Sequence, residues 1–450
     1  TISKTVDNLL HLHRFIMSIS IPKNMTRRSF VKSAAAFSVA SPAIAKTRNA
    51  NEKLNIALIG LGGQGNFQYN GLKDENIVAM CDVDSVRAGK NFAEFDSKAK
   101  FTDYRQMFDK MHKSIDAVAI STPDHSHFHP AYIAMDLDKH VYLEKPLAHS
   151  VWEVRTLTKK AQENNLVTQL GSQRHTKSNM HRVVELIQSG AIGDVSEVHS
   201  WVSSSRGMKP RLTEPQTIPN TLDYDLWLGP AKDTPYDSQI TPYGWRFWWD
   251  YGTGETGNWG CHILDIPYWA LDLKYPTRCS ASGPEAHPEM TTKSMTSWFE
   301  FPARGKQVPV KLYWHQTKAG PAILKELSLS SKGANTLFIG SKGMLITGFD
   351  QHKLLPEENY EDFKYPDQSI PASPGFHNEF INACKGDKTP PTCNFAYTGP
   401  LTETVLLANN AFRTKEEFDW DSGNLICKNA PKSQAFIKPT FKKGWDLGLK

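Results

Sequence analysis

A glycine pattern that directly follows a short apolar run is the feature that most constrains this fold. Residues 54–59 are apolar except for one Asn, which is typical of a buried strand in a parallel sheet. The loop that follows has G-x-G-x-x-G spacing and contains Gly60, Gly62, Gly63, Gln64 and Gly65. Its first glycine permits a tight turn, its second lets backbone N–H groups approach a pyrophosphate, and its third lets the next helix pack closely. We therefore predict that these five residues bind a dinucleotide at the start of a Rossmann domain.

A second strand is predicted at residues 77–81, and Asp82 follows it directly. Asp82 comes 20 residues after Gly62, where a carboxylate accepts hydrogen bonds from the adenosine ribose hydroxyls. The same carboxylate would repel a 2′-phosphate, so we expect NAD rather than NADP. The alternative interpretation is a glycine-rich turn followed by an Asp that only caps a helix.

Two more strands are predicted at residues 115–120 and 140–143, and polar residues follow each of them. Residues 121–127 follow the first strand, and Glu-Lys-Pro at residues 144–146 follows the second. Since ligands bind at the carboxyl ends of parallel strands, we expect both clusters to lie at a binding site.

Three alternating histidines, His125, His127 and His129, lie near the first of these clusters and have a spacing that can suit a metal. Pro130 follows them, however, and no Cys or acidic residues complete a ligand set. The six cysteines are scattered, without a C-x-x-C pair. We therefore predict no metal site.

The pattern changes after about residue 151. Residues 195–202 alternate with the two-residue period of a half-buried strand. Residues 208–257 are rich in Pro, Gly and aromatic side chains, and we interpret them as loops over a site. Asn258 and His262 come next and are four residues apart, so on a helix they would share one face.

These residues together resemble the family of glucose–fructose oxidoreductase, inositol dehydrogenase and the rhizopine-catabolism oxidoreductases (Gfo/Idh/MocA). The marks are the glycine loop, the strand before Asp82, Thr-Pro followed by His127, and above all Glu-Lys-Pro at residues 144–146. The resemblance covers nearly all of the chain after residue 45. It implies an α/β fold, with an NAD-binding Rossmann domain at residues 46–170 and a substrate-binding α/β domain at residues 171–450. The second domain is expected to contain a large, mostly antiparallel open sheet, through which a homo-oligomer would form.

The resemblance also implies roles for individual residues. Lys145 is expected near the nicotinamide and the substrate hydroxyl, with a cis bond to Pro146. The cofactor contacts expected on this side are Thr122, Pro123, His127, Glu144 and Lys145, of which the first three would lie along the nicotinamide riboside.

The third part of the expected catalytic site departs from the family pattern. The family usually has Asp four residues before the matched His, whereas this chain has Asn258 before His262. An Asn can orient a hydroxyl or an imidazole but cannot accept a proton. The candidate catalytic residues are therefore Lys145 and His262 as acid–base groups, with Asn258 beside them. The alternative for His262 is a purely structural histidine on a helix.

Residues 225–251 look like a signal-bearing bacterial branch of that family, and they favour a carbohydrate substrate. Trp rings stack on the apolar faces of pyranose rings, and Arg binds hydroxyls. The same aromatic residues would equally suit a core between sheet and loops. The candidate substrate contacts are Arg174, Trp245, Arg246, Trp248 and His262.

Residues 1–45 are interpreted as a leader with a twin-arginine signal. Residues 26–32 are T-R-R-S-F-V-K, a short apolar run follows, and residues 43–45 form an A-x-A cleavage signal. The apolar run is too short to span a bilayer, so we expect export to the periplasm and no membrane span. A plain disordered basic leader is the alternative. The leader carries the whole net charge of +5, and the balanced remainder gives no electrostatic reason to expect nucleic-acid binding.

The combined expectation is an NAD-dependent oxidoreductase that removes a hydride from a carbinol carbon of a carbohydrate. Export favours tightly bound NAD, because free NAD is scarce outside the cytoplasm. The alternative is a redox-neutral glycoside hydrolase in which tethered NAD forms and then removes a transient 3-keto sugar. A non-catalytic sugar or cofactor sensor is a third hypothesis, and the presence of Lys145 and His262 argues against it.

Overall fold

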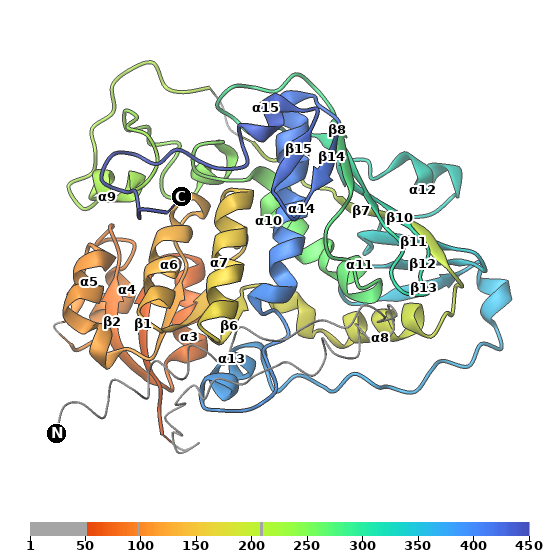
Figure 1. The fold of residues 1–450 in the computed structure, drawn as a ribbon, viewed down its shortest axis with the longest axis horizontal. Coiled ribbons are helices and arrows are strands. Elements are labelled where there is room, and N and C mark those ends of the chain that lie inside the picture. The colour runs from red at the N-terminus through yellow and green to blue at the C-terminus, as the bar shows by residue number, and fades with distance from the viewer. Residues whose placement is uncertain (1–51, 98, 208–209, 450) are drawn as a thin grey trace, which may run out of the picture. The chain divides into compact units, whose positions relative to one another are not determined.

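Two β-sheets organise the chain (Figure 1). The computed structural model describes residues 52–97, 99–207 and 210–449, all within one compact unit. The first sheet has six strands in the order β3-β2-β1-β4-β5-β6, and the second has nine in the order β13-β12-β11-β7-β10-β9-β8-β14-β15. A parallel Rossmann sheet followed by a mostly antiparallel sheet confirms the predicted fold class.

The first sheet is parallel throughout, and its strand order reverses between β1 and β4. Its strands are β1 (Asn55–Ile59), β2 (Asn76–Cys81), β3 (Lys100–Phe101), β4 (Ala117–Ile120), β5 (His140–Leu143) and β6 (Thr168–Leu170). Its helices are α3 (Gln64–Leu72), α4 (Gly89–Glu94), α5 (Tyr104–Met111), α6 (Phe128–Asp136) and α7 (Val151–Glu163). Every residue of β4 is buried, as expected of a strand covered on both faces. Ligands bind at the carboxyl ends of such strands where the order reverses.

The turn between β1 and α3 needs glycine at two points. Gly60 has a φ of +81°, and a Cβ there would lie 2.8 Å from the Ser121 carbonyl oxygen. A Cβ on Gly65 would lie 2.2 Å from the Gly60 carbonyl oxygen. The close packing predicted for the first and third glycines is therefore present.

The second sheet is antiparallel except for the pair β7–β10. Its strands are β7 (Val195–Val202), β8 (Arg278–Ser282), β9 (Met295–Phe301), β10 (Val310–Gln316), β11 (Thr336–Gly340), β12 (Met344–Thr347), β13 (His352–Leu355), β14 (Phe418–Asp421) and β15 (Ile426–Lys428). Along β9 and β10 buried and half-buried residues alternate, so one face of the sheet is in the core.

Helices cover that buried face and separate the two sheets. Figure 1 shows α10 and α14 between the six-stranded and the nine-stranded sheets, and both helices contact strands of the second sheet. The remaining helices are α8 (Ser178–Gln188), α9 (Tyr224–Leu228), α10 (Gly254–Ile263), α11 (Asp265–Ala270), α12 (Ala322–Glu326), α13 (Phe376–Cys384), α14 (Phe395–Thr414) and α15 (Pro431–Gln434). Short 3₁₀ turns include η2 (Asp124–Ser126), η3 (Gln173–Thr176) and η4 (Gly244–Phe247).

The C-terminal part of the chain returns to the first sheet. Phe376 and Phe380 of α13 pack in one cluster with Leu54 and Tyr142 of the Rossmann part. The Trp445 carbonyl oxygen lies 2.8 Å from His129 Nε2. Residues after 171 therefore help to build the surroundings of both sheets.

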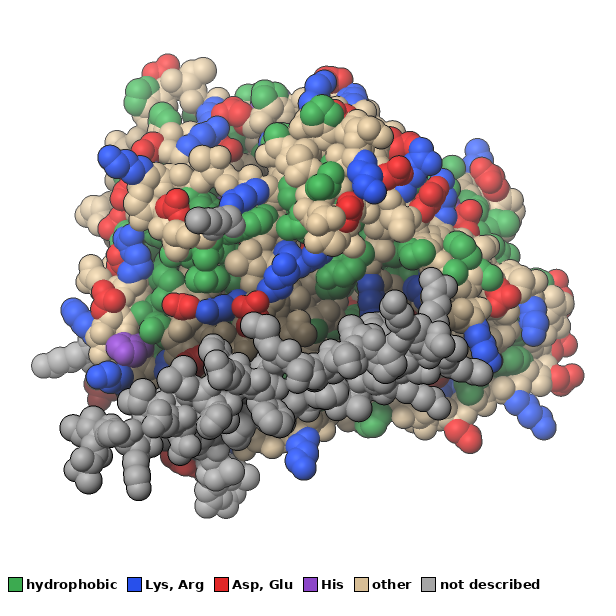
Figure 2. Space-filling view, in the orientation of Figure 1, with side chains coloured by type: hydrophobic (Ala, Val, Ile, Leu, Met, Phe, Trp, Pro, Cys, Tyr) green, Lys and Arg blue, Asp and Glu red, His purple; other side chains and the backbone are tan. Residues whose placement is uncertain are grey.

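The described surface carries mixed charge. Among the side chains visible in Figure 2, Lys and Arg alternate with Asp and Glu and do not gather into one basic field. Within the described residues, no helix has the length and apolar character needed to cross a membrane. The leader predicted at residues 1–45 falls outside the described part of the chain.

Candidate active site

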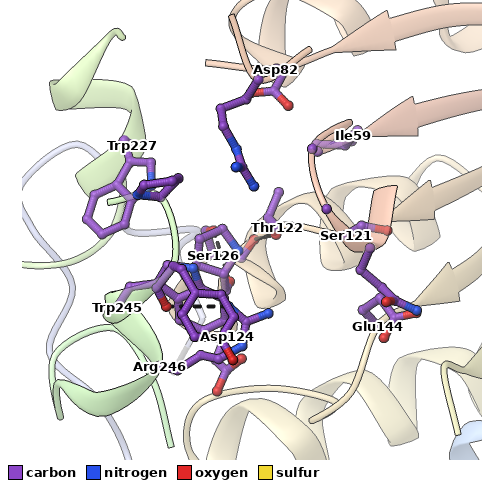
Figure 3. Close-up of a pocket in the computed structure, with 18 of the residues that line it drawn as sticks. Ile59, Asp82, Ser121, Thr122, Asp124, Ser126, Glu144, Trp227, Trp245 and Arg246 are labelled. Carbon is purple, nitrogen blue, oxygen red and sulfur yellow. Dashed lines mark hydrogen bonds between the residues drawn. The ribbon is translucent and has the colours of Figure 1, made fainter. Parts of the chain in front are cut away.

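A cavity of about 540 Å³ opens at the carboxyl ends of the parallel strands. In Figure 3, Asp82, Ser121 and Glu144 lie on the strand side of this cavity, which we call the main pocket. Trp227, Trp245 and Arg246 face them from the loop-rich segment between β7 and α10. The segment interpreted as loops over a site therefore forms one wall of the pocket.

The glycine loop forms the floor at one end of the main pocket. Gly60, Gly62, Gly63 and Gln64 line it, whereas Gly65 lies behind them against Gly60. The backbone N–H groups of Gly62 and Gly63 make no hydrogen bond within the described part of the chain. Free N–H groups ahead of a helix N-terminus are the donors that a pyrophosphate requires, so this loop fits a dinucleotide.

Asp82 lies beside the loop and anchors it. Its Oδ2 accepts a hydrogen bond from Leu61 N (2.7 Å), and its Oδ1 accepts one from Asp84 N (2.9 Å). Arg87, which belongs to no motif in the sequence, also lines the pocket, and a Cβ on Gly62 would lie 2.9 Å from its Nε. A carboxylate and a guanidinium thus lie together at the end of β2, where the ribose is bound in Rossmann domains.

The polar residues after β4 divide into two groups. Thr122 and Pro123 line the main pocket, as does Asp124, whose Oδ2 accepts hydrogen bonds from Thr253 N and Oγ1. His127 does not line the pocket, because its ring bridges two carbonyl oxygens, those of Pro146 (2.7 Å) and Thr122 (2.8 Å). It therefore ties the loops after β4 and β5 together.

Glu144 lines the pocket as a buried carboxylate. Its Oε1 accepts hydrogen bonds from Gln68 (2.6 Å), Gln173 (3.1 Å) and Gln64 (3.3 Å). A Cβ on Gly171 would lie 2.5 Å from the same oxygen, so glycine is needed there. Burial raises the pKa of Glu144, and Lys145 and the Gln donors oppose that shift.

Lys145 projects from the end of β5 toward helix α10. Its Nζ donates a hydrogen bond to Asn258 Oδ1 (2.9 Å), and the Lys145–Pro146 bond is cis, as expected. Burial lowers the pKa of Lys145, while the carboxylates of Glu144 and Asp124 oppose that shift. A lysine amine with a lowered pKa, held by a neutral acceptor, is suited to exchange a proton.

A buried carboxylate, paired with an exposed arginine, fixes the orientation of Asn258. Glu255, one turn earlier on α10, accepts a hydrogen bond from Asn258 Nδ2 (3.2 Å). Because the carboxylate only accepts, the Asn258 amide nitrogen faces Glu255 and its oxygen faces the Lys145 amine, so the amide has one orientation. Glu255 is itself paired with Arg206, through Nε–Oε1 (2.5 Å) and Nη2–Oε2 (2.8 Å). Burial would raise the pKa of Glu255, but the hydrogen bonds from Arg206, Ser204 and Asn258 outweigh burial and lower it.

This network explains the departure from the Asp of the family pattern. A carboxylate at position 258 would lie next to the Glu255 carboxylate, and like charges at that distance repel. An amide can contact a cation on one side and a carboxylate on the other. Glu255 was missed in the sequence, although it lies three residues before Asn258 and such residues are neighbours on a helix.

His262 lies on the same helix and lines the same pocket as Asn258. Burial lowers its pKa well below the ordinary value, and the positive charges of Lys145 and Arg174 add to the shift. Its Nδ1 has no hydrogen-bond partner in the described structure. The imidazole is therefore neutral, and it lines the pocket within reach of the Lys145 charge.

Of the other candidate substrate contacts, three line the pocket and one does not. Trp245, Arg246 and Arg174 line it, and the Arg246 guanidinium stacks on the Trp245 ring with its Cζ 4.3 Å from the ring centroid. Trp248 is 1% exposed, belongs to a separate aromatic cluster and does not reach the pocket. Trp248 therefore fills a core between the loops, which is the alternative given for these aromatic residues in the sequence.

The three alternating histidines all contact backbone carbonyl groups. His125 Nε2 lies 3.0 Å from the Trp227 oxygen, and His129 Nε2 lies 2.8 Å from the Trp445 oxygen. No group of three or more His, Cys, Asp or Glu side chains suited to a metal occurs in residues 52–97, 99–207 and 210–449.

Comparison with known proteins places this geometry in a family. The Gfo/Idh/MocA model described as an oxidoreductase family with an NAD-binding Rossmann fold matches residues 54–172. The model for the C-terminal alpha/beta domain of that oxidoreductase family matches residues 179–305. The chain belongs to the Gfo/Idh/MocA oxidoreductase family.

Individual relatives of this Gfo/Idh/MocA protein are distant. Inositol 2-dehydrogenase of Salmonella paratyphi B is 27% identical over 184 residues, which are 39% of this chain and 54% of the relative. UDP-N-acetylglucosamine 3-dehydrogenase of Acidithiobacillus ferrooxidans is 27% identical over 180 residues, 39% of this chain and 53% of the relative. The chain thus spans about half the length of the curated relatives it matches.

Solved structures show the same fold over a larger part of the chain. The WlbA dehydrogenase of Bordetella pertussis, solved with NADH and UDP-GlcNAcA, matches with a TM-score of 0.58 and 16% identity. The match covers 82% of this chain and 99% of that chain. The Rossmann domain of this Gfo/Idh/MocA protein is accordingly an NAD-binding domain.

We expect Asp82→Ala to raise the affinity of this Gfo/Idh/MocA protein for NADP relative to NAD. The carboxylate that would repel a 2′-phosphate is removed, and Arg87 remains to contact that phosphate. Dissociation constants for both dinucleotides, measured by calorimetry, test this. The double variant Asp82→Ala/Arg87→Ala is the matched control and should lose the gain in NADP affinity. Unchanged selectivity in Asp82→Ala would contradict the placement of Asp82 at the ribose.

We expect Asn258→Asp, which restores the usual family residue, to shift the pH profile of turnover. An added negative charge at the Lys145 amine stabilises its protonated form and raises its pKa, by about 1–3 units for such pairs. A base acts when unprotonated, so the rise of kcat with pH should move to more alkaline values. Asn258→Ala removes the hydrogen-bond acceptor without adding charge and should not move the pH profile of kcat to more alkaline values. An unmoved or more acidic profile in Asn258→Asp would contradict the role of Lys145 as the base.

Proposed function

We propose that this protein is an NAD-dependent oxidoreductase that takes a hydride from a hydroxyl-bearing carbon of a carbohydrate. The observation that carries the proposal is the hydrogen bond from Lys145 Nζ to Asn258 in a pocket continuous with the glycine loop. The neutral His262 lies in that pocket too. A hydride acceptor site and a proton acceptor thus share one cavity.

The residues of the chain account for the proton and for positioning. Bound NAD supplies the acceptor for the hydride that leaves the carbinol carbon. Unprotonated Lys145 accepts the hydroxyl proton at Nζ, while Asn258 holds that amine in place. The neutral His262 imidazole contacts the same hydroxyl and helps to orient it. The cavity walls limit water around these groups, which strengthens their electrostatic interactions.

The walls of the main pocket support a carbohydrate substrate. Trp245 offers an apolar ring, and the Arg174 and Arg246 guanidiniums offer donors for hydroxyl groups. Inositol 2-dehydrogenase and UDP-N-acetylglucosamine 3-dehydrogenase, among the relatives, are named for a polyol and a sugar nucleotide. Both the residues and these names favour a ring that carries several hydroxyl groups.

We also propose that NAD stays bound through purification and that the protein is exported by the twin-arginine route. The support is the leader pattern in residues 26–45 and the glycine loop that lines the cofactor end of the pocket. Protein that is gel-filtered in its folded state and then denatured should release a stoichiometric amount of NAD. A preparation free of NAD would contradict tight binding but not the oxidoreductase proposal.

A homo-oligomer formed through the nine-stranded sheet is a further part of the proposal. The outer face of that sheet carries the half-buried Trp298 and Tyr313, and the buried His199 stacks on Tyr313 at 4.6 Å between ring centroids. Partly exposed aromatic residues on a sheet are suited to contact a second copy. The molecular mass of the protein in solution tests this.

One experiment separates net oxidation from redox-neutral hydrolysis. A panel of sugars and glycosides is incubated with the enzyme in heavy water, and products and reduced cofactor are measured. Simple oxidation gives an oxidised sugar with reduced cofactor, and C2 keeps its hydrogen. Hydrolysis through a 3-keto sugar gives a released sugar with deuterium at C2 and no net reduction, because the C2 hydrogen is acidic only beside the ketone. The relatives reported above are named as dehydrogenases, and we expect the first result.

A further inference from the structure

A second cavity, of about 310 Å³, lies on the other side of the segment 249–253. It is bounded by the start of α7, the last turns of α14 and the segment 435–441. Asp124 and Gly254 line the main pocket, whereas their neighbours His125 and Thr253 line this one. We call it the rear cavity, and it is distinct from the cofactor and substrate pocket.

Arg413 presents an unpaired guanidinium to the rear cavity. It lies on the last turn of α14, between the rings of Phe436 and Trp249, with its Cζ 3.9 Å and 4.8 Å from their centroids. No hydrogen bond or ion pair joins its side chain to any described residue. Burial lowers the pKa of Arg413 to about 10, and Asp250 opposes that shift, so the group is charged at neutral pH. Two aromatic rings therefore hold a cation whose donor atoms are free.

Asn410 adds a second set of free donors. It precedes Arg413 by three residues on α14, so both side chains lie on one helix face, and both line the rear cavity. Asn410 is 7% exposed, yet its side-chain amide has no hydrogen-bond partner among the described residues. Its amide atoms are not fully enclosed by protein, so the amide faces the open space of the rear cavity and can donate to a ligand there.

The acidic groups around the rear cavity are already engaged. The Glu153 carboxylate accepts hydrogen bonds from Ser150 N (2.8 Å) and His149 N (3.2 Å). Asp250 is paired with Lys232 at 3.1 Å. Lys438 also lines the cavity, with its ammonium over the Trp152 ring. Among the charged groups of the rear cavity, those left without an ion-pair partner are cations, and a ligand of complementary charge is an oxyanion.

We propose that the rear cavity binds a small organic carboxylate, with Arg413 and Asn410 as its donors. A guanidinium binds a carboxylate through two parallel N–H···O bonds, and the Asn410 amide donates a third. The cavity volume lies at the lower end of the range for small-molecule sites, which suits a ligand the size of a monosaccharide acid. The carboxylate could come from an acidic sugar, while free phosphate shares the same oxyanion chemistry.

Calorimetric titration of the full chain saturated with NAD tests the proposal. D-glucuronate, inorganic phosphate and uncharged D-glucose are the three probes. We expect saturable binding of glucuronate, weakened about tenfold or more by Asn410→Asp, which replaces a donor with a negative charge at nearly equal volume. Arg413→Gln should weaken it at least as much. Tighter binding of phosphate than glucuronate would identify the ligand as free phosphate and overturn the carboxylate assignment.

Lys415→Gln is the matched control, since it removes a positive charge at the same helix end but outside the rear cavity. It should leave glucuronate binding unchanged, and melting temperatures verify that all variants are folded. Lys145→Ala should also leave it unchanged, because Lys145 lies in the main pocket. The proposal is overturned if no oxyanion binds saturably. It is equally overturned if binding is insensitive to Asn410→Asp and Arg413→Gln, or is lost in Lys145→Ala.

Discussion

Lys145→Ala should lower turnover by about 10²–10⁴-fold, while the protein stays folded and keeps NAD. The physical reason is that Lys145 Nζ is the amine directed into the pocket, and its lowered pKa suits it to accept the hydroxyl proton. The loss should be in kcat, since the amine acts on the proton and not on the pyrophosphate. Steady-state kinetics with any sugar that the panel identifies measure the change.

Two further variants test whether the loss of turnover in Lys145→Ala comes from lost proton transfer, from the lost positive charge or from a general effect of replacing a lysine. Lys145→Arg keeps the positive charge but stays protonated, so it should be nearly as inactive as Lys145→Ala. Lys177→Ala removes an exposed lysine paired with Asp350 and should have no effect on turnover. Full activity in Lys145→Ala, or recovery in Lys145→Arg, would rule out Lys145 as the base.

His262→Ala should cost a factor of the same order, about 10²–10⁴. Its imidazole is neutral and lines the pocket close enough to Lys145 for the lysine charge to lower its pKa. If the two groups act as one unit, the double variant Lys145→Ala/His262→Ala should be little worse than either single variant. His262→Gln, which keeps a polar contact but cannot exchange a proton, should remain slow. Multiplied losses in the double variant would show that the two residues act independently.

The cofactor half of the site could be predicted from the sequence because its signal is local. The signal comes from three short motifs: the glycine loop, the strand before Asp82 and the Glu-Lys-Pro after β5. Each motif determines the backbone conformation of its own few residues. A turn that needs glycine has few solutions, so its spacing predicts its geometry. The same holds for Asn258 and His262, whose helical spacing brings both to the pocket.

The rest depends on contacts between distant segments. His127 and Trp248 have residue types suited to a site, but tertiary packing directs one to two backbone carbonyls and buries the other in an aromatic cluster. Arg206 reaches Glu255 from 49 residues away, and no local pattern marks that pair. Arg413 lies 164 residues beyond Trp249, so the rear cavity has no signal in the sequence.

The central claim is that a hydride passes from a carbohydrate carbon to bound NAD beside Lys145. The most direct measurement mixes NAD-loaded enzyme with sugars and polyols that carry deuterium on their ring carbons, and then analyses the extracted cofactor by mass spectrometry. The account predicts that an accepted substrate transfers deuterium to the nicotinamide, and that Lys145→Ala slows this transfer by the factor given above. A cofactor that stays free of deuterium with every member of the panel, or a transfer equally fast without Lys145, would contradict it.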